Sequence, residues 1–148
     1  MLNDSLDLLR KYIVELPLVI NAQATAELTQ KASGKWSKKE ILGHLIDSSV
    51  NNLKRFTEAQ VISPYRYQAY LQDQLVRVNR YQNVPMGHLL TLWQSLNTQI
   101  LYVLEATPRE VLATAFIEFD AKDTELRPLS WLVEDYVTHL EHHMKTLV

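Results

Sequence analysis

The sequence predicts an all-α protein, a four-helix bundle formed by a single domain over residues 1–148. Apolar residues recur at helical spacing in four separate segments, and 5 prolines punctuate the chain. Only 3 residues are glycine, which disfavours a turn-rich β-protein. With 148 residues and 47% hydrophobic composition, the chain can bury one sizeable core without disulfides or a structural metal. Four amphipathic helices of this length are expected to pack as a bundle.

The first helix is expected from the apolar positions that recur every three or four residues between residues 6 and 16. Pro17 lacks an amide N–H and is expected to break or kink this helix, after which residues 18–28 continue the helical pattern. Ser33 and Gly34 then mark a loop.

The second helix has a clear start signal. Ser37 is expected to cap it, because Glu40 stands three residues later in the capping-box position. The helical pattern continues to Val61, shortly before Pro64. One side of this helix is expected to face the core, with Ile41, Leu42, Leu45, Ser49, Leu53 and Phe56.

Residues 65–83 are aromatic and polar with weak periodicity, and they predict a loop with a short helix. A strong apolar stripe over residues 89–104 predicts the third helix, which ends before Pro108. Residues 114–126 alternate briefly between polar and apolar, as expected for a short extended connection or a small hairpin. Pro128 suits the first turn of the fourth helix, whose apolar face runs from Leu132 to Leu147.

The composition argues against several classes of function. The net charge of −2 and the pI of about 6.2 give no basic surface for nucleic acid. No segment approaches the about 18 apolar residues needed to cross a bilayer, and residues 1–7 are too polar for a signal peptide. Neither GxGxxG nor GxxxxGK[ST] occurs. We therefore expect a cytoplasmic protein that acts on a small molecule, not on nucleic acid or a membrane.

The chain contains no cysteine, so a metal would be held by nitrogen or oxygen ligands. His139 and His143 lie four residues apart in the fourth helix, which places them about 40° apart on one shoulder of the apolar face. His44 has a similar position on the second helix and supplies a third nitrogen if the two helices are neighbours. Three protein ligands leave positions open for water or substrate. Asp135, one turn before His139, is expected to accept a hydrogen bond from the second ring nitrogen of His139.

Simpler interpretations stand beside these. A histidine pair near a helix C-terminus also fits solvated side chains that favour the negative end of the helix dipole. The polar residues after His44, namely Ser48, Asn51 and Arg55, are most simply a hydrated helix edge, although Asn51 and Arg55 remain candidates to orient a substrate. Tyr70 and Asp73 are candidates for a substrate pocket, while tyrosines here also serve packing.

Two segments resemble the DinB-like superfamily. One runs from Trp36 to Leu45 as WSKKEILGHL and is followed by Asn51, Asn52, Arg55 and Phe56; the other is EDYVTHLEHH at residues 134–143. The family hallmark is one histidine in the second helix and an HxxxH pair near the C-terminus, and His44, His139 and His143 match it. The likeness covers nearly the whole chain. It departs from the family at Leu75, where a tryptophan is common.

The resemblance implies an up-down-down-up bundle with a divalent cation, often nickel or zinc, on the three imidazoles, and often a homodimer. The family includes YfiT-type metal-dependent hydrolases and thiol-dependent S-transferases. Such a cation lowers the pKa of a bound thiol or water and so creates a nucleophile for an electrophilic small substrate. A low-molecular-weight thiol gives S-transfer and water gives hydrolysis. The alternative is a non-catalytic helical bundle that binds a metal or ligand, and the sequence leaves the general base open between Asp47 and Asp135.

Overall fold

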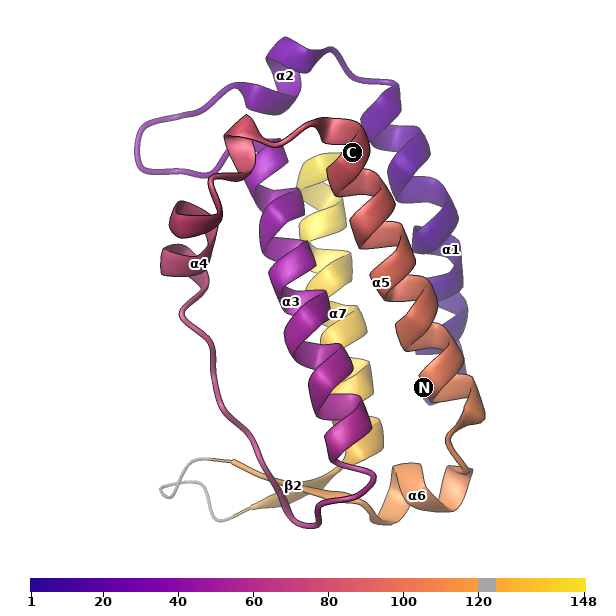
Figure 1. Ribbon diagram of the computed structural model, residues 1–148. Helices are drawn as coiled ribbons and strands as arrows, with labels where there is room; N and C mark the ends of the chain where they lie inside the picture. The colour runs from indigo at the N-terminus through magenta and orange to yellow at the C-terminus, as the bar shows by residue number, and fades with distance from the viewer. Residues whose placement is uncertain (120–124) are drawn as a thin grey trace.

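Four long helices form the bundle in this computed structural model, which describes residues 1–119 and 125–148 (Figure 1). The long helices are α1 (Leu2–Asn21), α3 (Lys38–Glu58), α5 (Met86–Ala106) and α7 (Leu129–Leu147). The shorter helical elements are α2 (Thr25–Thr29), α4 (Gln72–Asn79), the 3₁₀ helix η1 (Tyr81–Asn83) and α6 (Arg109–Thr114). The predicted all-α bundle is confirmed. None of the helices in the described residues has the length and apolar character needed to cross a bilayer.

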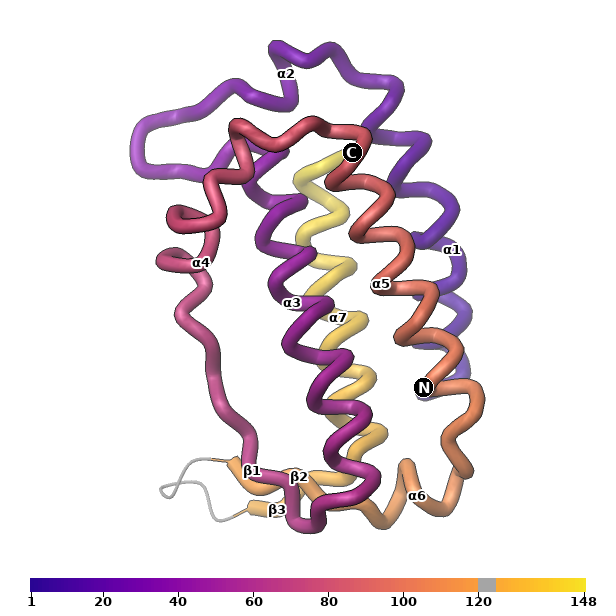
Figure 2. Tube along the Cα trace, in the orientation of Figure 1, coloured from indigo at the N-terminus to yellow at the C-terminus, as the bar shows by residue number. Residues whose placement is uncertain are grey.

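The long helices run up, down, down and up in chain order, as the family resemblance implies (Figure 1). α1 packs against α5 and α7, and α3 packs against the same two helices, so α1 and α3 occupy opposite corners of the bundle. α3 and α7 are therefore direct neighbours, which is the condition for a site shared between them. The segment from β1 (Tyr65–Arg66) through α4 runs along the outside of α3 (Figure 2).

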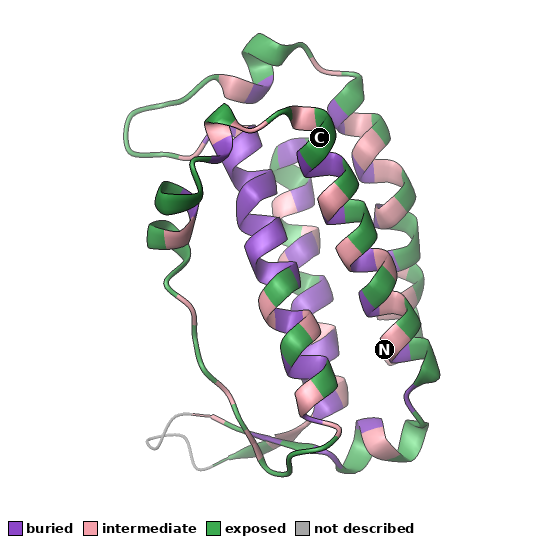
Figure 3. Cartoon of the chain, in the orientation of Figure 1, coloured by how far each residue is buried: buried purple, intermediate pink, exposed green. Residues whose placement is uncertain are grey.

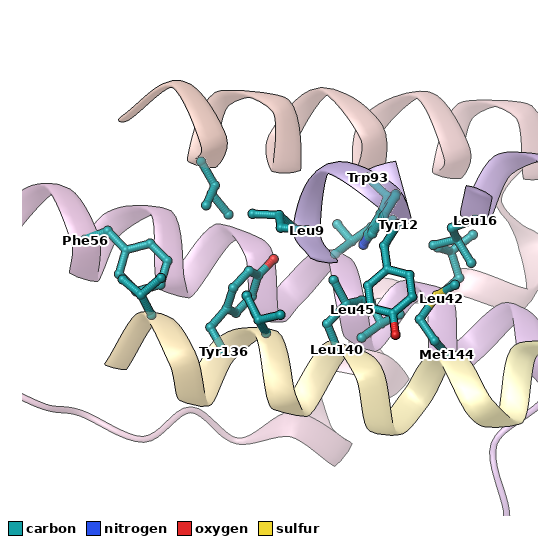
Figure 4. Packing of buried hydrophobic residues seen from close by; sticks show 14 of the residues in the cluster. Leu9, Tyr12, Leu16, Leu42, Leu45, Phe56, Trp93, Tyr136, Leu140 and Met144 are labelled. Atoms are coloured by element: carbon teal, nitrogen blue, oxygen red, sulfur yellow. The ribbon is translucent and has the colours of Figure 1, made fainter. Parts of the chain in front are cut away.

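α3 is the most enclosed helix, and every residue from 39 to 49 is buried (Figure 3). α5 and α7 cover two sides of α3, while α2, α4 and η1 cover further parts of its surface. Apolar side chains from all four long helices meet in the core (Figure 4). Among these side chains are Leu9, Leu42, Trp93 and Leu140. Enclosure of residues 39–49 places polar side chains of this stretch, among them His44 and Asp47, inside the protein as well.

The predicted capping box starts α3. Ser37 Oγ accepts a hydrogen bond from the Glu40 amide at 3.0 Å, and the Glu40 carboxylate accepts one from the Ser37 amide at 3.1 Å. Such caps stabilise a helix by about 1 kcal/mol. α3 ends at Glu58, earlier than the predicted Val61, because a tight turn follows that leads to the cis Ser63–Pro64 peptide.

Of the two outcomes predicted for Pro17, a break or a kink in the first helix, the break is wrong. α1 continues through Pro17 to Asn21, and α2 is a separate short helix. Leu16 and Ile20 are both buried in the core on either side of this position. Their packing holds both turns in place and offsets the one hydrogen bond that proline cannot donate.

A small sheet closes one end of the bundle (Figure 2). It contains β1 (Tyr65–Arg66), β2 (Phe116–Glu118) and β3 (Leu126–Pro128), in the order β1-β2-β3. β2 and β3 are antiparallel, with Ile117 opposite Arg127. Of the two alternatives predicted over residues 114–126, an extended connection or a small hairpin, the strand pair of the hairpin is present, and residues 120–124 of that prediction lie outside the described residues. β1 pairs in parallel with β2, a pairing that the sequence did not indicate.

Candidate metal centre

α3 and α7 bring three histidines together. The Nε2 atom of His139 lies 3.1 Å from Nε2 of His44 and 3.2 Å from Nε2 of His143. All three residues offer a ring nitrogen within 4.8 Å of the others. Leu140 and Met144, the residues after His139 and His143, point into the core (Figure 4). The imidazoles therefore lie at the rim of the contact between α3 and α7.

Burial keeps these imidazoles uncharged. His44 is only 1% exposed, and burial, followed by the charges of His139 and His143, lowers its pKa to about 4. Burial also lowers the pKa of His143 to about 4 and the pKa of His139 below its ordinary value. At neutral pH all three rings are in the neutral form, which is the form that binds metal ions.

The donor set fits a divalent cation. In a tetrahedral site with metal–nitrogen bonds of about 2.0–2.1 Å, neighbouring ligand nitrogens are about 3.3 Å apart. The two Nε2 separations from His139, 3.1 and 3.2 Å, are close to this spacing. Trp36 packs against the His44 ring with 4.9 Å between centroids, while Nδ1 of His44 is buried with no hydrogen-bond partner in the described part of the chain.

Two polar residues flank the cluster on α7. Asp135 is exposed, and its charge acts to raise the pKa of His139 against the stronger effect of burial. No hydrogen bond joins these two side chains in the structure, so the predicted orienting role of Asp135 stays a prediction. His142 is exposed and contacts His143 edge to face at 5.3 Å, outside the cluster as its spacing predicts.

A cavity of about 540 Å³ opens beside His139. Its walls come from α3, α7 and the segment before α4, and it is lined by Ser48, Asn52, Arg55, Tyr67, Ala69, Tyr70, Gln72, Leu132, Asp135, Tyr136, Thr138, His139 and His142. The interpretation of the polar stripe as a hydrated helix edge is wrong for Ser48 and Arg55, which are 2% and 5% exposed. The segment around Tyr67 and Tyr70 covers them, and sequence spacing on α3 alone carries no information about that cover.

Of the other residues predicted to bind a substrate, Tyr70, Asn51 and Asp73, only Tyr70 lines this cavity. Tyr70 lines the cavity, and its ring centroid lies 6.5 Å from that of His44. Asn51 does not line it and donates a 2.8 Å hydrogen bond to the Asp47 carbonyl. Asp73 is exposed in a separate depression, beside Arg77 and other residues of α4 and η1.

Asp47 belongs to a buried anchor for α4 and η1. Its Oδ1 accepts hydrogen bonds from the Tyr81 hydroxyl and from the Asn79 amide, and Oδ2 is buried without a partner in the described residues. Burial raises the pKa of this carboxyl group. Asp47 does not line the cavity, whereas Asp135 does.

A polar network that the sequence did not predict lies beneath the cavity. Tyr136 donates to Asn97 Oδ1, the Asn97 amide donates to Ser49 Oγ at 2.9 Å, and Ser49 Oγ lies 3.0 Å from the Tyr136 hydroxyl. The signal for it is the presence of Ser49 and Asn97 in otherwise apolar helix faces. Tyr136 also lines the cavity, so the network fixes part of its wall.

Comparison with known families decides the membership of the chain. The family model of the DinB superfamily matches residues 4–147. The chain belongs to the DinB superfamily. The membership implied by the histidine motifs is thus confirmed for this DinB superfamily protein. No curated protein matches it in sequence.

Two solved structures share the fold of this DinB superfamily protein. YfiT from Bacillus subtilis, described as a probable metal-dependent hydrolase with an unusual four-helix bundle topology, is 17% identical, with a TM-score of 0.84 over 96% of this chain and 81% of YfiT. A mycothiol-dependent maleylpyruvate isomerase is 13% identical, with a TM-score of 0.69 over 97% of this chain and 60% of the isomerase. At these identities the likeness concerns the fold.

Proposed function

We propose that this DinB superfamily protein is a metal-dependent enzyme that uses a divalent cation, nickel or zinc, held by His44, His139 and His143. The observation that carries the proposal is the convergence of three neutral imidazoles, one of which, His139, lines a cavity of about 540 Å³. Imidazole nitrogen is a suitable ligand for both metals. The reaction class is S-transfer or hydrolysis on an electrophilic small molecule.

The geometry supports an open site. His139 lines the cavity, while His44 is buried behind it against Trp36. Three protein ligands are typical of catalytic sites, in which a further position stays free for a reactant. When bound, the cation lowers the pKa of a coordinated thiol or water, so that a nucleophile is present at neutral pH.

Other residues of the chain line the cavity beside the proposed metal site. Tyr70, from the segment before α4, and Leu132, from α7, line the cavity together with His139. Asp135 is the one carboxylate among the described residues that line the cavity, and it is placed to accept the proton that a thiol or water loses. Because the chain contains no cysteine, S-transfer requires an external low-molecular-weight thiol.

The fold neighbours support an enzyme of this kind. YfiT is described as a probable metal-dependent hydrolase, and the isomerase depends on the thiol mycothiol. The two descriptions correspond to the two nucleophiles, water and thiol, that the proposed centre accommodates. We propose the same pair of reaction types for this chain.

Elemental analysis of untagged protein purified without chelators tests the proposal. We expect about one ion per chain in the wild type and little in the variant that combines His139→Ala and His143→Ala. His142→Ala is the matched control, because His142 lies on the same helix but outside the cluster. A wild-type protein that holds no metal and takes up neither added zinc nor added nickel would falsify the proposal.

A second measurement separates the two nucleophiles. Cobalt is substituted for the native metal, and the absorption spectrum is recorded with and without a low-molecular-weight thiol. A thiolate-to-cobalt charge-transfer band indicates S-transfer, whereas an unchanged spectrum together with turnover of ester or amide substrates indicates hydrolysis.

A further inference from the structure

Arg55 is a buried cation in the wall of the cavity. It is 5% exposed, and among the described residues it forms no ion pair with a carboxylate. Burial of a charged group is costly unless an opposite charge or hydrogen bonds compensate for it. The protein thus keeps a positive charge in the wall of a cavity with no carboxylate bonded to it in the described residues.

The guanidinium group is held in a defined orientation. It lies over the Tyr67 ring at 4.2 Å from the centroid and 5.5 Å from that of Tyr70. One Nη donates to Asn52 Oδ1 at 3.3 Å and the other donates to the Gln68 carbonyl. A guanidinium has five N–H donors, so three of them have no acceptor in the described residues. The guanidinium group of Arg55 is therefore fixed in orientation and retains N–H groups that can donate to a ligand.

The charge of the lining favours a singly charged ligand. Arg55 is the one lysine or arginine among the described residues that line the cavity, and burial keeps His139 neutral. The one carboxylate of the lining, Asp135, lies one turn before His139 on α7 and forms no ion pair with Arg55, so the positive charge available to a ligand is the single charge of Arg55. A guanidinium pairs with a carboxylate through two parallel hydrogen bonds. A phosphate monoester, with about two negative charges, would need more positive charge than this cavity provides.

The position of Arg55 also defines the shape of the ligand. His44 and Arg55 are eleven residues apart on α3, which corresponds to about 16 Å along the helix and nearly the same face. The cavity is lined by both Arg55 and His139, and it therefore extends along the contact between α3 and α7. A ligand that reaches both ends is elongated.

We propose that Arg55 is a carboxylate-binding residue, and that one reactant of this protein carries a carboxylate far from its reacting atom. The identity of that molecule as a reactant rests on the proposed function, whereas carboxylate binding by Arg55 does not. A role limited to holding the segment around Gln68 uses one of the five N–H donors, and it leaves three donors without an acceptor in the described residues.

The test is an NMR titration of the full-length ¹⁵N-labelled protein with hexanoate and with the neutral, equally long hexanamide. It is run on protein stripped of metal and on protein supplied with zinc. We expect hexanoate to shift the Arg55 side-chain Nε–H signal and to bind at least tenfold more tightly than hexanamide in both samples. Equal affinity of the two probes overturns the proposal, and so does a hexanoate preference that exists only in the zinc sample.

Substitutions test whether Arg55 is responsible for the preference for hexanoate over hexanamide. Arg55→Gln should lose the preference for hexanoate, Arg55→Lys should retain only part of it, and Arg77→Gln, an exposed arginine outside the cavity, should retain all of it. A preference that survives in Arg55→Gln overturns the proposal. If Arg55→Gln does not fold, the comparison of hexanoate with hexanamide on the wild type and on Arg55→Lys decides the matter.

The test of carboxylate binding by Arg55 does not depend on whether the protein binds a metal. A chain that takes up no zinc but binds hexanoate through Arg55 contradicts the proposed enzyme and supports the carboxylate site. The source of the carboxylate is assigned by competition in the zinc-supplied protein. Displacement of hexanoate by glutathione assigns the group to the thiol, whereas hexanoate that stays bound at saturating glutathione assigns it to the electrophilic substrate.

Discussion

The ring of Tyr81 lies directly on the backbone of Gly43, the residue before His44. A Cβ atom at position 43 would lie 2.0 Å from Cδ2 of this ring, well inside van der Waals contact. From this position the Tyr81 hydroxyl donates to Asp47. The glycine therefore permits η1 to dock on α3 next to the histidine cluster.

Gly43→Ala is expected to destabilise the protein by about 1–3 kcal/mol, because the buried ring must move to accommodate the methyl group. The measurement is urea unfolding followed by circular dichroism. Gly87→Ala is the control: nothing lies within 4 Å of its added Cβ, and the substitution should be neutral or stabilising by up to about 1 kcal/mol. Equal midpoints for Gly43→Ala and the wild type would contradict the docking role.

Tyr136→Phe is expected to lower the free energy of unfolding by about 1–3 kcal/mol, since it leaves the buried Asn97 carbonyl without its donor. Tyr102→Phe, at an exposed position on α5, should leave the free energy of unfolding unchanged. Both effects are read from urea unfolding curves. A loss of similar size in the two variants would indicate that the polar network contributes nothing.

The metal-free protein is expected to lose stability as the pH falls from about 6.5 to about 4. Because burial lowers the pKa of folded His44 to about 4, the unfolded chain binds more protons in this range, and acid favours unfolding. The contribution of His44 is present above about pH 6.5 and amounts to about 1–3 kcal/mol. Urea midpoints at pH 7.0, 5.5 and 4.5 measure the loss.

His44→Gln removes the His44 contribution and should reduce the pH dependence relative to the wild type, while His143, whose pKa burial also lowers to about 4, retains its share. His88→Gln, at an exposed position, is the control and should keep the wild-type slope. A His44→Gln curve parallel to that of the wild type would show that His44 titrates alike in the folded and unfolded chain.

Zinc is expected to raise the melting temperature of the wild type at pH 7. A ligand at 100 times its dissociation constant stabilises the folded state by about 2.7 kcal/mol. The double substitution His139→Ala and His143→Ala should abolish the shift, and His142→Ala should preserve it. The measurement is differential scanning calorimetry, and an equal zinc shift in the double variant would place the ion elsewhere.

Local sequence signals determined much of the fold. The capping box of Ser37 and Glu40 starts α3 because both partners lie within one helical turn. The spacing of His139 and His143 places them on one shoulder of α7 for the same reason, since helical periodicity needs no information from distant parts of the chain. These features depend on residues no more than four positions apart.

Only the tertiary structure decided the features that depend on packing between distant segments. α1 passes through Pro17 because Leu16 and Ile20 are buried on either side, and Arg55 is buried because residues around Tyr67 cover it. Likewise, His44 meets His139 only because α3 and α7 occupy adjacent corners of the bundle. Sequence periodicity shows which face of a helix is polar, but burial of that face depends on which other element covers it.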